Sequence, residues 1–219
     1  MLERANKIKT DTIVLGAGGH AKVLIDCLLS IDNLNIIGII EVNKALIGTK
    51  ILGIPVIGHE DEILKQRNFN IKLVNGVGSA NLPIARREIF NKFKQAGFSF
   101  LNVIHRTSYI GGTVSLGEGI QVMAGSIIQP AVSIGNNTII NTHAVIEHDC
   151  QIGDHVHIAP GVVCCGGTVI GSGTHIGCGA VIREGLKIAE NCMIAAGAVV
   201  VHNITANSKV GGVPAKIME

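Results

Sequence analysis

A histidine flanked by two acids is the strongest candidate for chemistry in this sequence: His148 lies between Glu147 and Asp149. A carboxylate bonded to one ring nitrogen fixes the tautomer of an imidazole and makes the other nitrogen a better base. Such a histidine can take a proton in general base catalysis. The sequence does not decide which acid does this. Because neighbours on a strand point in opposite directions, Asp149 can reach His148 only if the pair lies at a corner of the chain.

The element that must position His148 is a six-residue repeat. From Ile110 to Val200 every sixth residue is aliphatic, except Cys164. A period of six matches neither a helix nor a plain strand, and it indicates a parallel β-helix. Three hexads would close one triangular coil, so residue n lies under residue n+18 at a spacing of about 4.8 Å. The sixteen hexads predict about five coils, with no long loop protruding from them.

Two further positions of the hexad carry predictions. The residue four places after the aliphatic is small or β-branched, from Ser126 to Ala180, which suits the tight interior of a corner. Glycine often follows the aliphatic directly, as at Gly111 and Gly171. We expect unusual backbone dihedral angles at these glycines, because glycine tolerates them best.

The eighteen-residue register brings two pairs of residues together. Gly166 is expected beside His148, where its N–H is a candidate oxyanion donor next to a general base. His175 is expected beside His157, which predicts a short ladder of histidines along one edge.

A metal site is a rival interpretation of the histidines. His143 and His148 form an H-x₄-H pair that is similar to part of the zinc site of γ-class carbonic anhydrases, which share this β-helix. That family needs a third histidine two coils away, and the sequence offers only Glu184 there. We therefore expect no metal, and we expect His143, His155 and His175 to be turn residues that face solvent.

The first hundred residues alternate strands and helices, which is typical of an α/β domain with a parallel sheet. Thr12–Leu15 predicts a buried strand, Gly16–Ala21 has the GxGxxA spacing of a nucleotide-binding turn, and Lys22–Leu29 predicts a helix. Such a turn lets the backbone approach a phosphate, and the helix N-terminus favours an anion. The next strand, Asn35–Ile40, ends in Glu41, where an acidic residue would meet a ribose.

The following elements are expected at Glu60–Arg67 (helix), Ile71–Gly78 (strand), Asn81–Gln95 (helix) and Phe98–Ile104 (strand). The helix that ends at Gln95 is amphipathic, and we expect its apolar side to carry Ile84, Ile89 and Phe93 and its polar side to carry Arg86, Arg87 and Lys94. Ligands of parallel sheets bind outside the carboxyl ends of the strands. Gly16–His20, Glu41 and Gly78 all fall at such ends.

Composition excludes several classes of protein. The net charge is only +2, which gives no electrostatic footprint for nucleic acid. No apolar run has the length of a membrane span, and the polar first residues predict no signal peptide. The six cysteines lack CxxC spacing, so we expect reduced packing residues in a cytoplasmic protein. A covalent route through Cys164 or Cys165 is a rival to base catalysis by His148.

The chain resembles one family along nearly its whole length. The resemblance rests on Gly16–His20, the hexads, Asn141–His148 and the closing Gly212–Lys216. This family is the bacterial sugar acyltransferases, which acetylate amino nucleotide sugars or sialic acids and include the bacillosamine and perosamine N-acetyltransferases. The resemblance implies a Rossmann-like nucleotide-sugar-binding domain over residues 1–106 and a left-handed β-helix acetyltransferase domain over 107–219. It also implies a homotrimer with acetyl-CoA bound between subunits. The left hand is an exception to the usual right-handed crossover.

Residue roles follow from the resemblance as expectations. His148 matches the catalytic base and Asp149 the acid that supports it. Acetyl-CoA would be bound by His157, Gly166, Cys178 and Ala196. The nucleotide sugar would be bound by Gly16, Ala17, Gly18, Glu41, Gly78 and Asn141. Glu41 stands where relatives that bind UDP often have aspartate.

The expected reaction is direct acetyl transfer. His148 takes a proton from the acceptor as it attacks the thioester, and the Gly166 N–H or His157 stabilises the developing oxyanion. The acid after His148 favours N-acetylation of a nucleotide-linked 4-amino-4,6-dideoxy sugar. Two alternatives stay open: O-acetylation of a sialic or related nonulosonic acid, and a non-catalytic β-helix that binds a sugar nucleotide or acts as a scaffold.

Overall fold

The computed structural model describes residues 9–66, 68 and 70–218 of the 219-residue chain. The absence of a signal peptide was predicted largely on residues 1–8, which lie outside these described residues. The chain divides into two compact units, one of Met1–Val77 with Lys92–Leu101 and one of Gly78–Asn91 with Asn102–Glu219. In the described part of the chain, no helix has the length and apolar character needed to cross a membrane.

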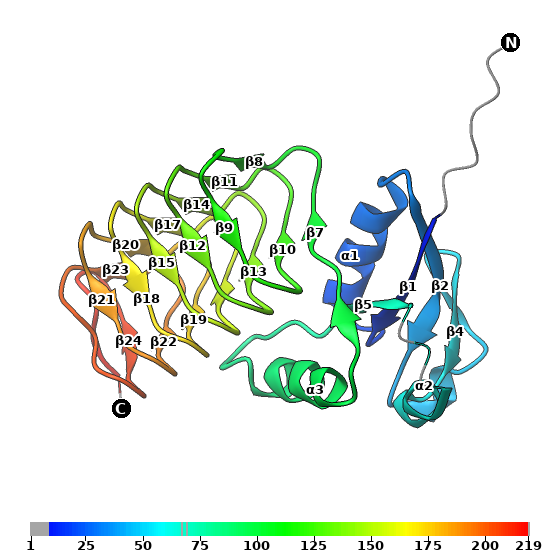
Figure 1. Ribbon diagram of the computed structural model, residues 1–219. Coiled ribbons are helices and arrows are strands. Elements are labelled where there is room, and N and C mark those ends of the chain that lie inside the picture. The colour runs from blue at the N-terminus through cyan, green and yellow to red at the C-terminus, as the bar shows by residue number, and fades with distance from the viewer. Residues whose placement is uncertain (1–8, 67, 69, 219) are drawn as a thin grey trace, which may run out of the picture. The chain divides into compact units, whose positions relative to one another are not determined.

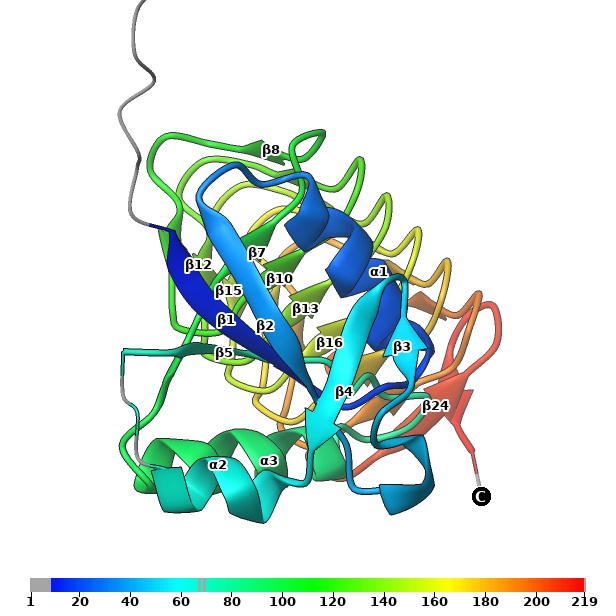
Figure 2. The same cartoon turned by 90° about the vertical axis from the view of Figure 1, so that its right-hand side faces the viewer.

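The first unit is built on a six-stranded sheet in the order β3-β4-β2-β1-β5-β6 (Figures 1 and 2). Its strands are β1 (Thr10–Leu15), β2 (Leu34–Ile40), β3 (Lys50–Ile51), β4 (Ile54–Gly58), β5 (Lys72–Asn75) and β6 (Ser99–Phe100). Its helices are α1 (Gly19–Leu29), the short 3₁₀ helix η1 (Lys44–Leu46) and α2 (Glu60–Gln66), and α3 (Ile84–Gln95) runs through both units. All pairs are parallel except the β3–β4 hairpin, so the predicted α/β class is confirmed.

The single strand predicted over Phe98–Ile104 is wrong. Ser99–Phe100 forms β6 and pairs with β5, whereas Val103–Ile104 forms β7 and pairs with β10 of the repeat. Asn102 explains the break, because its side chain donates to Gly117 O at 2.9 Å and accepts from Ile120 N at 2.9 Å. These bonds tie the chain to the next coil, so the first coil begins one hexad earlier than Ile110.

The orientation predicted for α3 is right for Phe93, which is buried, and for Lys94, which is exposed, but it is wrong for Arg86 and Ile84. Arg86 is 1% exposed, whereas Ile84 is 49% exposed. The buried positions Arg86, Phe90 and Phe93 follow the helical period. Arg86 Nε donates to the backbone oxygen of Asn137 at 3.0 Å, and a satisfied polar group can be buried at lower cost. Burial lowers the pKa of Arg86 to about 9.

The second unit is a left-handed β-helix in which each hexad contributes one two-residue strand (Figure 1). A first sheet has the order β25-β24-β22-β19-β16-β13-β10-β7, a second β23-β20-β17-β14-β11-β8 and a third β21-β18-β15-β12-β9. Within the described residues, β7 to β21 make five complete coils and β22–β23 begin another. Paired strands are eighteen residues apart, as in Gln121↔Ile139 and Ile139↔His157, so the predicted register is confirmed.

The strands of the repeat are β8 (Tyr109–Ile110), β9 (Ser115–Leu116), β10 (Gln121–Val122), β11 (Ile127–Ile128), β12 (Ser133–Ile134), β13 (Ile139–Ile140), β14 (Val145–Ile146), β15 (Gln151–Ile152), β16 (His157–Ile158), β17 (Val163–Cys164), β18 (Val169–Ile170), β19 (His175–Ile176), β20 (Val181–Ile182), β21 (Lys187–Ile188), β22 (Met193–Ile194) and β23 (Val199–Val200). The closing pair is β24 (Lys209–Gly211) and β25 (Lys216–Ile217), which are antiparallel.

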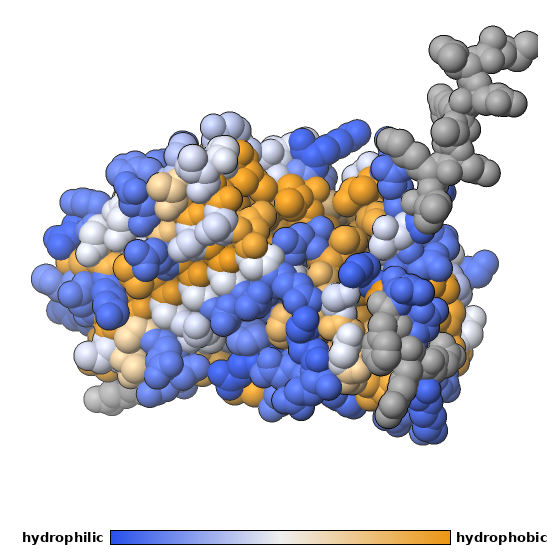
Figure 3. All heavy atoms as spheres, viewed as in Figure 1, coloured by the Kyte–Doolittle hydropathy of each residue, from blue (hydrophilic) through white to orange (hydrophobic). Residues whose placement is uncertain are grey.

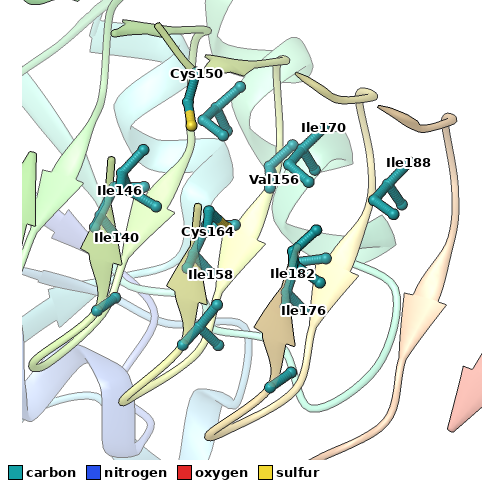
Figure 4. Close-up of a cluster of buried hydrophobic side chains, with 14 of the residues drawn as sticks. Ile140, Ile146, Cys150, Val156, Ile158, Cys164, Ile170, Ile176, Ile182 and Ile188 are labelled. Atoms are coloured by element: carbon teal, nitrogen blue, oxygen red, sulfur yellow. The ribbon is translucent and has the colours of Figure 1, made fainter. Parts of the chain in front are cut away.

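The core of the β-helix is a set of stacked aliphatic columns. Ile140, Ile158 and Ile176 lie one above another at eighteen-residue steps, and all are fully buried (Figure 4). The small position is buried too, from Ser126 to Ala180. Both predictions about the interior are therefore confirmed.

The predicted reason for the glycines after the aliphatic residue is wrong. A positive φ recurs three places after the aliphatic instead, for example φ 55° at His143 and 59° at Asp149. At Gly171, a Cβ would lie 2.5 Å from the backbone carbon of Ala189 in the next coil. Glycine follows the aliphatic residue at these positions because the neighbouring coil leaves no room for a side chain there.

The outward faces of the three sheets differ in character. The second sheet presents apolar residues along its strands, namely Tyr109, Ile127, Val145, Val163, Val181 and Val199. The third sheet presents mostly polar residues, namely Ser115, Ser133, Gln151, Val169 and Lys187. In the space-filling view, apolar residues lie in bands along the repeat (Figure 3).

Candidate active site

His148 and Asp149 lie at the corner of the chain between β14 and β15. His148 Nδ1 is 2.8 Å from Asp149 Oδ2, and the two side chains are 65% and 66% exposed. The positive φ of Asp149 turns the backbone at this corner, which lets two successive side chains meet. Asp149 is therefore the flanking acid that contacts the ring, and it does so through Nδ1.

Gly166 lies against the ring of His148, one coil further on. A Cβ at Gly166 would lie 2.7 Å from His148 Cε1 and 2.8 Å from Nε2. The carbonyl of His148 accepts a hydrogen bond from Gly167 N at 2.9 Å, which fixes the two coils in register. Among the described residues, no acceptor is bonded to the Gly166 N–H. This arrangement leaves a backbone donor open beside a candidate base.

The predicted histidine ladder is present on the first sheet. His157 pairs with His175, and their ring centroids are 4.9 Å apart. Each of the two is only 6% exposed, so the expectation that His175 faces solvent is wrong. Ser79, from the segment before α3, lies against both, with its Oγ 2.8 Å from His157 Nδ1 and 3.5 Å from His175 Nδ1.

The other two histidines differ from each other. His143 is exposed, as predicted. His155 is half-buried, with its ring 5.5 Å from that of Phe90 and its Nδ1 3.0 Å from Asn137 Nδ2. Burial lowers the pKa of His155, and it lowers the pKa of His175 in the same way.

These two buried histidines predict acid sensitivity of folding. An unfolded histidine titrates near pH 6.5, whereas burial lowers the pKa of His155 and of His175 in the folded state. Stability should be complete above about pH 6.5 and fall as the pH drops below it, because the unfolded chain then binds more protons. Thermal unfolding at pH 7.5 and 5.5 checks this. His175→Asn should weaken the dependence, and the exposed control His143→Asn should not.

Three more predicted residues lie at the corner between the first and second sheets. Asn141 starts this corner on one coil, and Cys178 and Ala196 lie at it two and three coils further on. Gly197 N donates to Cys178 O at 2.8 Å, which stacks these two coils. Cys178 is exposed. This corner and the corner of His148 border opposite edges of the second sheet, so one chain does not bring the two groups together.

The cysteines near His148 are poor nucleophiles. Cys164 is fully buried in the core, and burial raises its pKa. Cys165 is half-buried, and burial together with Glu184 and Glu147 raises its pKa. Since the thiolate is the reactive form, this disfavours the covalent route.

The side chain of Glu41 anchors the predicted nucleotide turn. Ala17 N donates to Glu41 Oε2 at 2.7 Å, and Asn43 N donates to Oε1 at 2.9 Å. The sequence did not reveal this anchoring role, which joins the turn to the end of β2.

The glycines of this turn leave its backbone open. Gly16 has φ 92°, and α1 begins at Gly19, earlier than predicted, with Gly18 as an N-cap that makes no side-chain bond. A Cβ at Gly18 or Gly19 would meet nothing within 4 Å. The backbone can thus approach an anion closely. Gly78, the remaining predicted residue, belongs to the second unit.

Two family models match the chain. The PglD N-terminal domain matches residues 11–93, and the bacterial transferase hexapeptide model of six repeats matches residues 131–166 and 167–202. A comparison with curated protein sequences finds no match. Among the described residues, no group of three His, Cys, Asp or Glu could hold a metal ion.

Solved structures match over almost the full chain. A mutant of perosamine N-acetyltransferase from Caulobacter crescentus, in complex with CoA and GDP-perosamine, is 33% identical, with a TM-score of 0.88 over 95% of this chain and 97% of that one. The acetyltransferase domain of PglB from Neisseria gonorrhoeae, in complex with acetyl coenzyme A, is 30% identical, with a TM-score of 0.88 over 96% and 100%. WeeI from Acinetobacter baumannii is 27% identical, with a TM-score of 0.81 over 94% and 99%.

The fold, the repeat and these matches define the class: the chain is a hexapeptide-repeat acyltransferase. Within that class it belongs to the bacterial sugar acetyltransferases that carry a PglD-type N-terminal domain, to which the predicted resemblance pointed.

Proposed function

We propose that this enzyme transfers an acetyl group from acetyl-CoA to the amino group of a nucleotide-linked 4-amino-4,6-dideoxy sugar. The observation that carries the proposal is the His148–Asp149 pair, with a nitrogen-to-oxygen distance of 2.8 Å, placed against Gly166. The 33% identity to a perosamine N-acetyltransferase supports the substrate class.

In the proposed reaction His148 is the general base. Asp149 holds the proton on Nδ1, so Nε2 accepts the proton of the sugar amine as the nitrogen attacks the thioester carbonyl. The new carbon–nitrogen bond forms, the carbon–sulfur bond breaks, and His148 Nε2 passes its proton to the CoA sulfur, which leaves as the thiol. The Gly166 N–H is a donor for the negative oxygen that develops in between. Every proton is accounted for without an acyl-enzyme.

The N-terminal domain, residues 1–106, supplies the proposed nucleotide-sugar site, and the β-helix domain, residues 107–219, supplies the acetyl-transfer site. Gly16, Ala17 and Gly18 offer backbone to a phosphate, with Glu41 holding the turn in place. Cys178 and Ala196 offer backbone groups to the pantetheine arm along their corner of the β-helix. The six free thiols suit a reducing compartment, and we propose a cytoplasmic location.

We further propose a homotrimer with the active sites between subunits. The second sheet separates His148 and Gly166 at one edge from Cys178 and Ala196 at the other, by a side of six residues or about 20 Å. A second copy packed on this sheet would place the opposite corners of two chains next to each other. The apolar outward row of that sheet, with Tyr109 54% and Ile127 36% exposed, supports such packing.

A charge in this row should dissociate the trimer. Val163→Glu places a carboxylate in the middle of the apolar row, and burying it unpaired is costly. The control Val169→Glu occupies the equivalent outward position of the mostly polar third sheet. Light scattering after gel filtration should give three times the 22.9 kDa of one chain for the wild type and the control. A wild type of one-chain mass would contradict the trimer.

The function is tested by release of CoA thiol from acetyl-CoA. The acceptors are GDP- and UDP-linked 4-amino-4,6-dideoxy sugars and, for comparison, a sialic acid. Turnover with an amino sugar supports N-acetylation, whereas turnover with sialic acid alone would replace it by O-acetylation. If no acceptor releases thiol and acetyl-CoA does not bind, the chain is a binding or scaffold protein and the proposal fails.

A further inference from the structure

A serine outside every predicted motif completes a hydrogen-bonded network in the second unit. Ser79 Oγ lies 2.8 Å from His157 Nδ1, and Asn141 Nδ2 lies 3.2 Å from His157 Nε2. Both ring nitrogens of His157 therefore have a hydrogen-bond partner. Ser79 and His157 are 78 positions apart in the chain. The network joins three side chains, of which the sequence singled out only two.

The orientation of Asn141 sets the direction of the bonds. Its Oδ1 accepts from Thr142 N at 2.8 Å and from Thr142 Oγ1 at 3.3 Å. The amide nitrogen must then face His157, and an amide nitrogen only donates. His157 Nε2 is consequently an acceptor and carries no proton.

The position of the imidazole proton follows. A neutral imidazole has one N–H, and with Nε2 accepting it must be at Nδ1. His157 Nδ1 thus donates to Ser79 Oγ, and the serine hydroxyl is free to donate toward His175 Nδ1 at 3.5 Å. A charged His157 would set an N–H against the NH₂ group of Asn141. Burial of His175 also favours its neutral form, because desolvation lowers its pKa.

We propose that Ser79 is a positioning residue: it fixes His157 in the Nδ1–H tautomer, and His157 in turn holds the amide of Asn141 in place for the acceptor sugar. This inference rests on the proposed function for the role of Asn141. It also assigns the donor for the oxyanion, because an accepting Nε2 on His157 cannot donate. Of the two donors that the sequence left open, the Gly166 N–H remains.

The first test is spectroscopic and needs no substrate. Two-bond ¹H–¹⁵N spectra of the full-length enzyme with ¹⁵N-labelled histidine distinguish the two neutral tautomers, and His157→Gln assigns the signals. We expect Nδ1–H in the wild type and in Ser79→Thr, and a shift toward Nε2–H or a mixture in Ser79→Ala. The control Ser133→Ala, on the third sheet, should match the wild type. A wild type with Nε2–H or a charged ring, or an unchanged Ser79→Ala spectrum, would overturn the proposal.

The second test is kinetic. Loss of one buried hydrogen bond should raise KM for the amino sugar about tenfold in Ser79→Ala. KM for acetyl-CoA should change little, the melting temperature should fall by about 2–4 °C, and Ser79→Thr should restore both the KM and the melting temperature. Equal loss in both Ser79 variants, or a change in acetyl-CoA KM alone, would contradict the positioning role. If the wild type shows the expected tautomer but no turnover with any acceptor, the proposed function fails while the tautomer assignment stands.

Discussion

Replacing His148 by alanine is expected to slow acetyl transfer by about 10²–10⁴-fold in kcat, which is the usual contribution of a positioned general base. The imidazole is 65% exposed, so the melting temperature should stay close to that of the wild type. Thiol release from acetyl-CoA at saturating amino sugar measures the loss. Acetyl-CoA binding by calorimetry should be retained, since the base is needed for chemistry rather than for affinity.

His143→Ala is the matched control for this loss. His143 is also an exposed histidine at a corner, one hexad before Asp149, and it shares its left-handed backbone. Within the described residues no acid contacts its ring. It should keep full activity. Retained activity in His148→Ala, or an equal loss in His143→Ala, would remove His148 from the role of base.

Gly166→Ala should cost about 10²-fold in kcat, the scale expected when a catalytic group is displaced by roughly 1 Å. The new methyl would lie 2.7–2.8 Å from the ring of His148, and the exposed ring would have to move away from it. Because the ring is free to move, stability should change little. The measurement pairs thiol release with thermal unfolding of the same preparation.

Gly167→Ala separates this effect from backbone strain. Gly167 has φ 65°, and a Cβ there would meet no atom closer than 4.0 Å. This variant should therefore lose stability, by about 1 kcal/mol for a left-handed alanine, and keep its activity. The opposite pattern, with Gly167→Ala inactive and Gly166→Ala active, would show that the approach of Gly166 to His148 is not what the reaction needs.

Most of the β-helix could be predicted because its contacts repeat. Each hexad makes the same strand, so the step of eighteen residues is enough to place Gly166 beside His148 and His175 beside His157. The choice of Asp149 over Glu147 could not be made in this way. It depends on the positive φ of one corner residue, Asp149, and the eighteen-residue register does not predict that backbone angle.

The features that escaped prediction depend on contacts that do not repeat. Arg86 was expected at the surface because arginine usually is, yet its bond to the carbonyl of Asn137 spans 51 positions. Ser79 lies in a segment without periodicity, and only its contacts with His157 and His175 distinguish it from other serines. The anchoring of Ala17 by Glu41 likewise joins two loops that are far apart in the sequence.

Equivalent positions of successive coils lie about 4.8 Å apart along the axis of the β-helix. The corner of His148 and Asp149 recurs eighteen residues later at Gly166 and Gly167, with the same left-handed residue in second place. A histidine–aspartate pair at 166–167 would therefore lie one coil further along the axis. Glu184 occupies the same corner in the coil after that. Such a shift leaves the core unchanged, but the ring would then need a glycine at position 184 in place of Glu184, so divergence in acceptor length within this architecture needs three substitutions and no insertion.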